Sequence, residues 1–312
     1  MQETTQKRSE FYYLGVDGGG SKTLAILVDA NGQEQGRGQA GSSNYANLGL
    51  KRAIASIQSA VEQALQAANC HLPVQGAWLG VSGLDRSEDH AALFPHLSAL
   101  ARQVHLSNDA ELLLSALDGA AGVALIAGTG SIALGRDARN TTARAGGWGN
   151  VMGDEGSGYD LGRLALQAAA RAADGRGELT LLLDLILQHW QLDKADAMIG
   201  EVYPDDDKGK IACLSTYVFQ AARQGDAIAQ AIVEQAASEL ALAALTVGKA
   251  LDLPLALPLA LGGGLLIHEA DLREQVLYHI HRQRATGQVV LVEQPALSAA
   301  QAMIHLTPFS GT

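Results

Sequence analysis

The stretch Leu14–Thr23 reads LGVDGGGSKT, and a second stretch of the same design, LIAGTGS, lies at Leu125–Ser131. In each, an apolar run ends in glycines beside a small hydroxyl side chain, and a second apolar run follows. This pattern predicts a strand, a tight turn and a returning strand. Glycines let an anion approach the backbone closely, and turn amides can donate to phosphate oxygens. Two such turns, each opening a half of the chain, indicate a duplicated scaffold that grips one polyphosphate from both sides.

The first turn matches neither common nucleotide-binding fingerprint. Lys22 comes two residues after the glycines, whereas the lysine of a P-loop closes a four-residue gap. The turn also leads into an apolar run typical of a strand, whereas the dinucleotide fingerprint leads into a helix. Taken alone, the segment is therefore equally compatible with a glycine-rich hairpin that binds no ligand.

Length and composition limit the class of protein. The chain has 312 residues, 47% hydrophobic and 18% charged, which is enough for two cores and excludes a wholly disordered chain. A net charge of -11 gives no general attraction to nucleic acid or anionic lipid. We find no apolar stretch of membrane-spanning length and no signal peptide. We therefore expect a cytoplasmic protein that binds neither nucleic acid nor membrane, with residues 1–10 as a flexible tail.

Apolar runs alternate with helical stretches along the chain, which predicts an α/β fold with mainly parallel sheets covered on both faces. The expected strands are 12–16, 24–28, 33–38, 77–81, 104–106, 123–127, 132–134, 255–261 and 288–292. The expected helices are 50–68, 87–102 with an interruption near Pro95, 110–117, 159–173, 179–189, 211–224, 226–250 and 296–304. We place a domain boundary between Ala110 and Gly122. The expected domains are 11–117 and 118–312, and a last helix within 296–308 can pack back on the first.

Asp109 stands where an expected strand stops and an expected helix starts. It can cap that helix, and Asn108 with Glu111 can form an approximate capping box. It can also act as a general base, because ligands in parallel α/β sheets bind outside the carboxyl ends of the strands. A carboxylate at that position can accept a proton from an attacking hydroxyl. The two roles are compatible.

The segment Gly146–Gly158 reads GGWGNVMGDEGSG and holds six glycines around an acidic pair. Purely structural loops rarely need so many conformationally permissive positions. Flanking glycines would let the carboxylates of Asp154 and Glu155 meet a small polyol or a metal-bound water. A mobile surface loop is the alternative.

Five motifs occur in a fixed order: DGGGSKT at 17–23, GTGS at 128–131, GGWG at 146–149, MGDEGS at 152–157 and GGG at 262–264. In this combination the sequence resembles the N-acetylglucosamine kinases of the BadF/BadG/BcrA/BcrD ATPase family, within the actin–sugar kinase–Hsp70 superfamily. The resemblance spans nearly the whole chain. It implies two ribonuclease-H-like domains of duplicated topology around a central cleft.

The resemblance also implies roles for individual residues. The phosphate- and nucleotide-binding residues it implies are Gly18, Gly19, Gly20, Ser21, Lys22, Gly128, Thr129, Gly130 and Ser131, with Gly262, Gly263 and Gly264 as the adenosine motif. Asp109 falls at the position of the catalytic base and also contacts sugar. Asn44 and Asp154 match sugar-binding side chains, with Gly147 alongside. Asp17 would hold Mg²⁺ mainly through water, since magnesium commonly keeps several waters.

A kinase that uses ATP and Mg²⁺ is therefore expected, most simply one that converts N-acetylglucosamine to its 6-phosphate. Its partners would be the sugar and ATP, and we expect a homodimer. A glucosamine kinase or a broad-specificity hexose kinase is an alternative within the same group. An activator ATPase that acts on a partner protein is an alternative of another class. Such activators hold an iron–sulfur cluster through cysteines, and Cys70 and Cys213 lie in no glycine motif of that kind.

Overall fold

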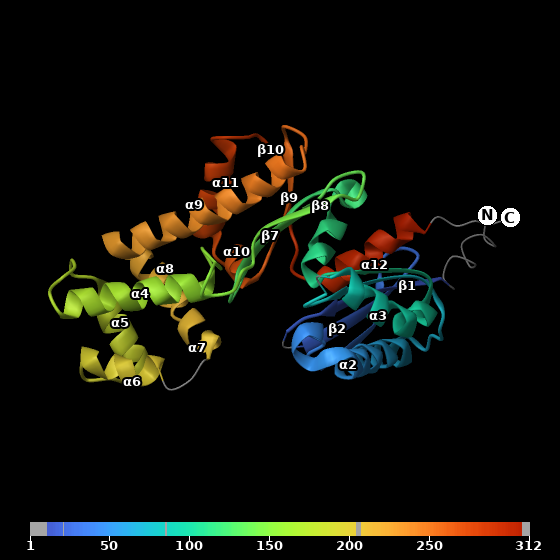
Figure 1. The fold of residues 1–312 in the computed structure, drawn as a ribbon, viewed down its shortest axis with the longest axis horizontal. Helices are drawn as coiled ribbons and strands as arrows, with labels where there is room; N and C mark the ends of the chain where they lie inside the picture. The colour runs from blue at the N-terminus through green and yellow to red at the C-terminus, as the bar shows by residue number, and fades with distance from the viewer. Residues whose placement is uncertain (1–10, 21, 85, 204–206, 308–312) are drawn as a thin grey trace. The chain divides into compact units, whose positions relative to one another are not determined.

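The computed structural model describes residues 11–20, 22–84, 86–203 and 207–307, and Ser21 lies outside them. The chain divides into two compact units (Figure 1). Unit 1 comprises Met1–Ala120 and Val292–Thr312, and unit 2 comprises Ala121–Leu291. The chain thus leaves unit 1, builds unit 2 and returns to unit 1.

Unit 1 contains a five-stranded sheet in the order β3-β2-β1-β4-β5. The strands are β1 (Tyr12–Gly18), β2 (Lys22–Asp29), β3 (Glu34–Gly41), β4 (Val74–Val81) and β5 (Ala101–Ser107). β1 pairs antiparallel with β2 and parallel with β4, and β4 pairs parallel with β5. The carboxyl ends of β1, β4 and β5 therefore meet at one edge of the sheet.

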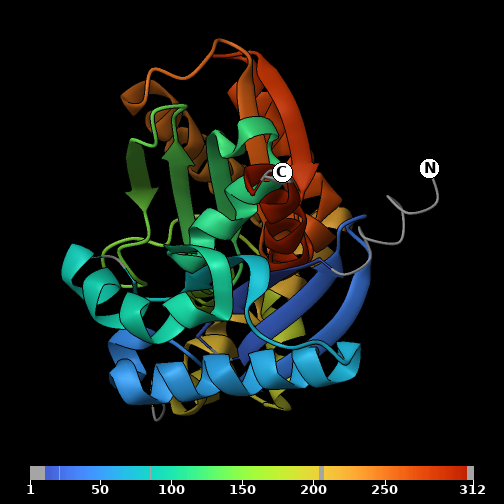
Figure 2. The ribbon, with the colours of Figure 1, turned by 90° about the vertical axis from the view of Figure 1, so that its right-hand side faces the viewer.

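Helices cover both faces of this sheet, and successive side chains of β1 point alternately to the two faces. Leu14 and Val16 point into a cluster with Ile57 of α2 (Tyr45–Ala68), which lies along the sheet in Figure 2. Tyr13 points the other way, into a cluster with Met303 of α12 (Pro295–Leu306). Burial on both faces explains the nearly continuous apolar run of β1 and β2.

Unit 2 repeats the topology. Its sheet has the order β8-β7-β6-β9-β10, with the strands β6 (Gly122–Ala127), β7 (Ser131–Arg136), β8 (Thr142–Gly146), β9 (Leu257–Gly262) and β10 (Thr286–Leu291). In both units, the third, second, first, fourth and fifth strands follow one another across the sheet. The predicted α/β fold with duplicated topology is confirmed, but each sheet is mixed rather than mainly parallel, because its second strand pairs antiparallel with both the first and the third.

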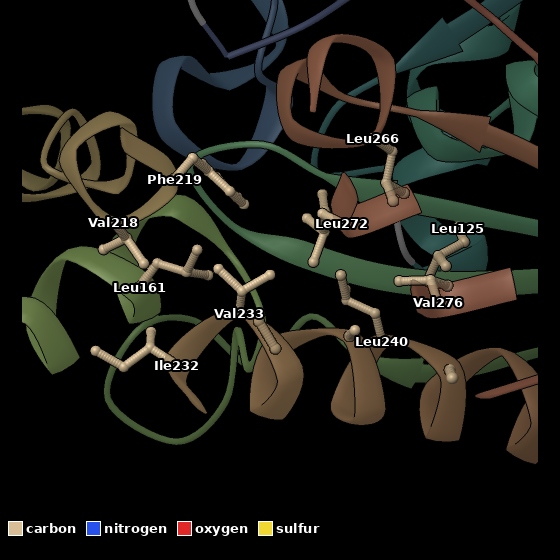
Figure 3. Packing of buried hydrophobic residues seen from close by; sticks show 14 of the residues in the cluster. Leu125, Leu161, Val218, Phe219, Ile232, Val233, Leu240, Leu266, Leu272 and Val276 are labelled. Carbon is tan, nitrogen blue, oxygen red and sulfur yellow. The ribbon is translucent and has the colours of Figure 1, made fainter. Parts of the chain in front are cut away.

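Helices inserted between β8 and β9 supply most of the core of unit 2. They are α4 (Gly158–Ala173), α5 (Leu181–Trp190), η4 (Ala195–Ala197), α6 (Met198–Val202), α7 (Lys208–Ala212), α8 (Ser215–Arg223) and α9 (Ala227–Ala250). After β9 follow α10 (Gly264–His268) and α11 (Ala270–His281). Figure 3 shows Leu161, Val233 and Leu240 of this core, which pack in one cluster with Leu125 and Val276.

The structure differs from the sequence expectations at several places. The helix expected over 87–102 ends at Leu97 as α3 (Ser87–Leu97), and after η1 (Ser98–Leu100) the chain enters β5, where Ala101 pairs with Val74. The helix expected over 211–224 is divided between α7 and α8. β8 was not predicted, because its five residues, TARAG, include two alanines and a glycine, which have low strand propensity.

One helix corrects the expectation about membrane-spanning segments. α9 is long and apolar enough to cross a membrane by length and composition alone, and half of its most apolar window is buried inside the protein. Ten of its residues belong to the buried core of unit 2, among them Val233 and Leu240. An apolar helix packed in this way against a sheet and other helices is typical of a protein core.

Candidate functional site

The carboxyl edge of the sheet in unit 1 brings two acidic side chains together. Asp17 on β1 pairs with Gly80 on β4, and Gly80 pairs with Ser107 on β5, so the three residues form one row across the sheet. Asp109 follows two residues beyond Ser107, at the start of η2 (Asp109–Ala116). The negative charge of Asp17 acts on Asp109. The two carboxylates therefore occupy the edge where parallel sheets bind their ligands.

Both carboxylates hold protons more tightly than usual. Partial burial raises the pKa of Asp17 to about 6, and the positive charge of Lys22 acts in the opposite direction. Partial burial also raises the pKa of Asp109 to about 6, and the charge of Asp17 adds to the rise. A carboxylate with a pKa nearer to neutrality is a better general base at neutral pH than an ordinary one.

The helix cap beside Asp109 comes mainly from its neighbour. Asn108 is the N-cap residue of η2, and its Oδ1 accepts a hydrogen bond of 2.9 Å from the backbone N–H of Ala110. Oδ1 of Asp109 accepts from the same N–H at 3.0 Å. Because Asn108 already caps the helix, the Asp109 carboxylate is not needed to start η2 and remains available for other chemistry.

Ser82, a residue that the sequence analysis did not single out, links Asn44 to Asp109. Oδ1 of Asn44 caps α2 by accepting from the N–H of Asn47 at 2.9 Å, and its Nδ2 donates to Oγ of Ser82 at 3.2 Å. The hydroxyl of Ser82 in turn forms a hydrogen bond that lowers the pKa of Asp109. The only sequence signal for Ser82 is its place directly after β4.

The first glycine turn lies at the same edge. The N–H of Gly19 donates to the carbonyl of Lys22 at 3.0 Å, which closes the hairpin between β1 and β2. The N–H of Ser82 donates to the carbonyl of Gly18 at 2.8 Å. A Cβ placed on Gly20 would meet no described protein atom within 4 Å, so this backbone is open to a ligand.

In unit 2, the loop after β8 folds back on the second glycine turn. The N–H groups of Gly158 and Tyr159 donate to the carbonyls of Gly128 and Thr129, at 2.7 and 3.2 Å. Oγ of Ser131 donates to the carbonyl of Glu155 at 2.7 Å. The turn and residues 154–159 therefore form one hydrogen-bonded structure.

Asp154 lies beside this turn. A Cβ on Gly130 would be only 3.1 Å from Oδ2 of Asp154. Partial burial raises the pKa of Asp154, while hydrogen bonds from the N–H groups of Ser131 and Gly149 lower it. Its backbone has a φ of 60°, a conformation that asparagine and aspartate tolerate best among residues with a Cβ. The carboxylate is thus held beside the second glycine turn by its own backbone and by donors around it.

The third glycine motif neighbours the second. Ile126 at the end of β6 pairs with Gly262 at the end of β9. Gly263 has a φ of 83°, and a Cβ there would lie 2.3 Å from the carbonyl oxygen of Ala127. Gly264 starts α10, and its nitrogen is 3.9 Å from the position of a Cβ on Gly128. Gly262–Gly264 and Gly128 therefore share the carboxyl edge of the second sheet.

Gly147 bends the chain at the start of the tryptophan loop. Its φ is 70°, its N–H donates to the carbonyl of Ser131 at 3.1 Å, and a Cβ would lie 2.7 Å from Cδ1 of Ile132. The next residue, Trp148, is 58% exposed, and the Arg144 guanidinium lies 4.8 Å from the centre of its ring. Gly147 thus acts through its backbone, and Trp148 is left at the surface of unit 2.

The candidate residues form one group in each unit. In unit 1, the described members are Asp17, Gly18, Gly19, Gly20, Lys22, Asn44 and Asp109; in unit 2 they are Gly128, Thr129, Gly130, Ser131, Gly147, Asp154, Gly262, Gly263 and Gly264. A hollow of about 690 Å³ lies elsewhere in unit 2, between α8, α9 and α11. Its lining includes none of the glycine turns.

Comparison with known proteins places the chain in a family. Residues 14–283 match the family model described as the BadF/BadG/BcrA/BcrD ATPase family. The chain belongs to this family. The match contains all the described residues of both groups, from Asp17 to Gly264.

Two relatives and one solved structure that resemble the chain are described as sugar kinases. The chain is 34% identical over 247 residues to an N-acetyl-D-glucosamine kinase of Dictyostelium discoideum, covering 74% of this chain and 77% of that protein. It is 33% identical over 247 residues to an N-acetylmuramic acid/N-acetylglucosamine kinase of Clostridium acetobutylicum, covering 78% and 81%. A solved structure from Chromobacterium violaceum, described as a candidate N-acetylglucosamine kinase, is 28% identical with a TM-score of 0.72 and covers 95% of this chain and 99% of its own.

Proposed function

We propose that the protein is an ATP-dependent sugar kinase that transfers the γ-phosphoryl group of ATP to a hydroxyl of an aminosugar. N-acetylglucosamine is the substrate we favour, with its 6-phosphate as product. The observation that carries the proposal is Asp109, a partly buried carboxylate with a pKa of about 6 at the carboxyl ends of the parallel strands β1, β4 and β5. The similarity to relatives described as N-acetylglucosamine kinases supports the choice of sugar.

In this proposal Asp109 accepts the proton of the attacking hydroxyl. The sugar oxygen then attacks the γ-phosphorus in line with the leaving oxygen of ADP, and the proton ends on the carboxylate of Asp109. Phosphoryl transfer requires little covalent chemistry from the protein, so accurate positioning of this oxygen supplies most of the acceleration. The hydrogen bonds from Ala110 and Ser82 orient the carboxylate for that purpose.

The glycine turns are the proposed phosphate sites. The N–H groups of Gly19 and Gly128 already donate to the carbonyls of Lys22 and Gly130. The other backbone N–H groups in Gly18–Gly20 and Gly128–Ser131 donate to phosphate oxygens, and Lys22 neutralises negative charge near them. Gly262–Gly264, beside the second turn, contacts the adenosine part. The family's description as ATPases supports ATP as the phosphate donor.

A divalent cation fits the donor set of unit 1. Asp17 and Asp109 are partly buried carboxylates that repel each other, and a cation between phosphate oxygens and this edge would relieve that repulsion. Magnesium accepts oxygen ligands and keeps several waters, so Asp17 would hold it through water. When bound, Mg²⁺ would neutralise charge that develops on the phosphate oxygens.

Asn44 and Asp154 are the proposed sugar contacts, with the backbone of Gly147 alongside. A buried sugar hydroxyl without a partner costs about 1–3 kcal/mol, so each needs a donor or acceptor. The Asn44 side chain has one N–H and one oxygen lone pair left beyond its two hydrogen bonds, and the Asp154 carboxylate is a strong acceptor.

We also propose that the protein is a cytoplasmic homodimer. Light scattering of the purified protein tests its oligomeric state.

A panel of sugars tests the proposal. ADP release from ATP is measured with N-acetylglucosamine, N-acetylmuramic acid, glucosamine, glucose and no sugar, and mass spectrometry identifies the phosphorylated product. We expect the highest kcat/KM with N-acetylglucosamine. A broad hexose kinase would accept glucose equally well. ATP hydrolysis that no sugar stimulates would contradict the kinase proposal and favour an activator ATPase.

A further inference from the structure

We propose that Ser82 is a positioning residue whose hydroxyl joins Asn44 to Asp109 in a one-way chain of hydrogen bonds. It would fix the Asn44 amide for sugar binding and the Asp109 carboxylate for proton transfer. The inference deepens the proposed function and rests on Asp109 as the base and on Asn44 as a sugar contact.

The direction of the chain follows from what each group can do. The backbone N–H of Asn47 can only donate, so the Asn44 atom 2.9 Å away must be the oxygen Oδ1. The other amide atom of Asn44 is then Nδ2, which can only donate, and it lies 3.2 Å from Oγ of Ser82. Ser82 therefore accepts from Asn44, and its single hydroxyl proton is left for another acceptor.

That acceptor is the carboxylate of Asp109, which takes part in a hydrogen bond with the Ser82 side chain. An ionised carboxylate only accepts, so the chain ends there. Oδ1 of Asp109 also accepts from the N–H of Ala110 at 3.0 Å. Two donors, one from β4 and one from η2, thus hold the carboxylate plane.

Ser82 is itself held on both sides by the backbone. Its N–H donates to the carbonyl of Gly18 at 2.8 Å, and its carbonyl accepts from the N–H of Tyr45 at 2.8 Å. The residue is therefore tied to the first glycine turn and to the first residue of α2. A hydroxyl on so constrained a backbone can fix its partners, because side chains near a site are positioned best by rigid elements.

Steady-state kinetics with three variants tests the inference. In Ser82→Ala both links are lost, so we expect kcat to fall roughly tenfold, the cost of one hydrogen bond to a charged group. We also expect the KM for sugar to rise several-fold because Asn44 loses its partner, while the KM for ATP changes little. Ser82→Thr keeps the hydroxyl and should restore most of kcat. Ser115→Ala, which removes a hydroxyl bonded to the Leu112 carbonyl within η2, is the matched control and should behave as the wild type.

A double-mutant cycle decides whether Ser82 acts through Asp109. If it does, Ser82→Ala should lower kcat in the wild type and cause no further loss in Asp109→Asn. An equal loss in both backgrounds would overturn the inference, as would an unchanged kcat in folded Ser82→Ala or a failure of Thr to restore activity. Should Ser82→Ala not fold, Ser82→Cys, a weaker donor of similar size, must be slower than Ser82→Thr.

The outcome for Asp109→Asn separates the two proposals. If that variant keeps near-normal turnover, the base assignment and the proposed mechanism are wrong. If Asp109→Asn is inactive while Ser82→Ala is normal, the kinase mechanism stands and only the role of Ser82 is refuted.

Discussion

Replacing Asp109 by asparagine should stabilise the protein while it removes catalysis. The folded state raises the pKa of Asp109 from 3.8 to about 6, and partial burial is the main cause. Each pKa unit corresponds to about 1.4 kcal/mol, so the ionised carboxylate costs the fold up to about 3 kcal/mol at neutral pH. Asparagine keeps an oxygen for the N–H of Ala110 and carries no charge to repel Asp17. Because the side chain is partly in contact with solvent and the amide must also be desolvated, we expect a net gain of about 1–2 kcal/mol.

The gain should depend on pH with a definite sign. A carboxyl whose folded pKa is raised stabilises the folded state below the unfolded pKa, near 4, and loses that contribution as the pH rises through about 6. The difference between Asp109→Asn and the wild type should therefore be largest above pH 7 and disappear near pH 4.

Calorimetric unfolding of both proteins without ligand, at pH 7.5 and pH 4.5, measures this difference in stability. ADP release at pH 7.5 should show that the kcat of Asp109→Asn is lower than that of the wild type by roughly 100-fold or more. Asp226→Asn is a control of opposite sign. Although partial burial raises the pKa of Asp226, hydrogen bonds from Ala229, Leu181 and Thr180 bring it below its usual value, so its loss should destabilise at neutral pH. A destabilised Asp109→Asn at pH 7.5, or a gain of equal size at both pH values, would refute the reasoning.

Three further predictions concern Asp109, the two glycine turns and Asp154. The kcat/KM for sugar should fall about tenfold per unit below pH 6 as Asp109 takes up a proton, and a pH–rate profile flat down to pH 5 would contradict its role as the base. The new Cβ of Gly20→Ala meets no described protein atom, so this variant should keep its unfolding temperature and raise the KM for ATP. Gly130→Val should weaken the binding of both ATP and sugar, because its side chain would press on Asp154. Calorimetric titrations in which either variant loses only sugar affinity would contradict this prediction. Asp154→Asn should lower sugar affinity about tenfold through the lost charge, and the loop should stay folded because asparagine tolerates the positive φ. Asp154→Ala should lower both sugar affinity and the stability of the protein. If both variants lose Mg²⁺-dependent ATP binding and keep sugar binding, Asp154 belongs to the metal site.

The fold class could be predicted because its signals are local. An apolar strand, a glycine turn and a returning strand follow one another directly in the sequence, and the pattern occurs twice, around Leu14–Thr23 and Leu125–Ser131. β8 could not be predicted, because it is only five residues long and contains two alanines and a glycine, which are depleted in strands; pairing with β7 orders it. For the same reason pairing with β4 overrode helix propensity at Ala101.

The candidate site is less visible in the sequence, because its contacts join distant segments. Asp109 is suggested by its position at a strand end, but its pKa is raised mainly by burial and further by the charge of Asp17, ninety-two positions earlier in the chain. Ser82 is a single serine without a motif, and only the structure brings it to Asn44. The position of Asp154 beside Gly130 likewise depends on how the loop returns to the turn, which no local pattern records.

The return of the chain to unit 1 has a consequence for biosynthesis. α12 covers one face of the first sheet, where Tyr13, Trp78 and Met303 are buried together, and a ribosome makes this helix after every other described element of the two units. Until then, the first 120 residues expose an apolar sheet face while the whole of unit 2 is translated. Unit 2 is continuous in sequence and can complete its core first, so the unit that is synthesised first is the one that folds last. A nascent chain stalled before Pro295 should therefore bind chaperones through unit 1 and be cleaved there by proteases.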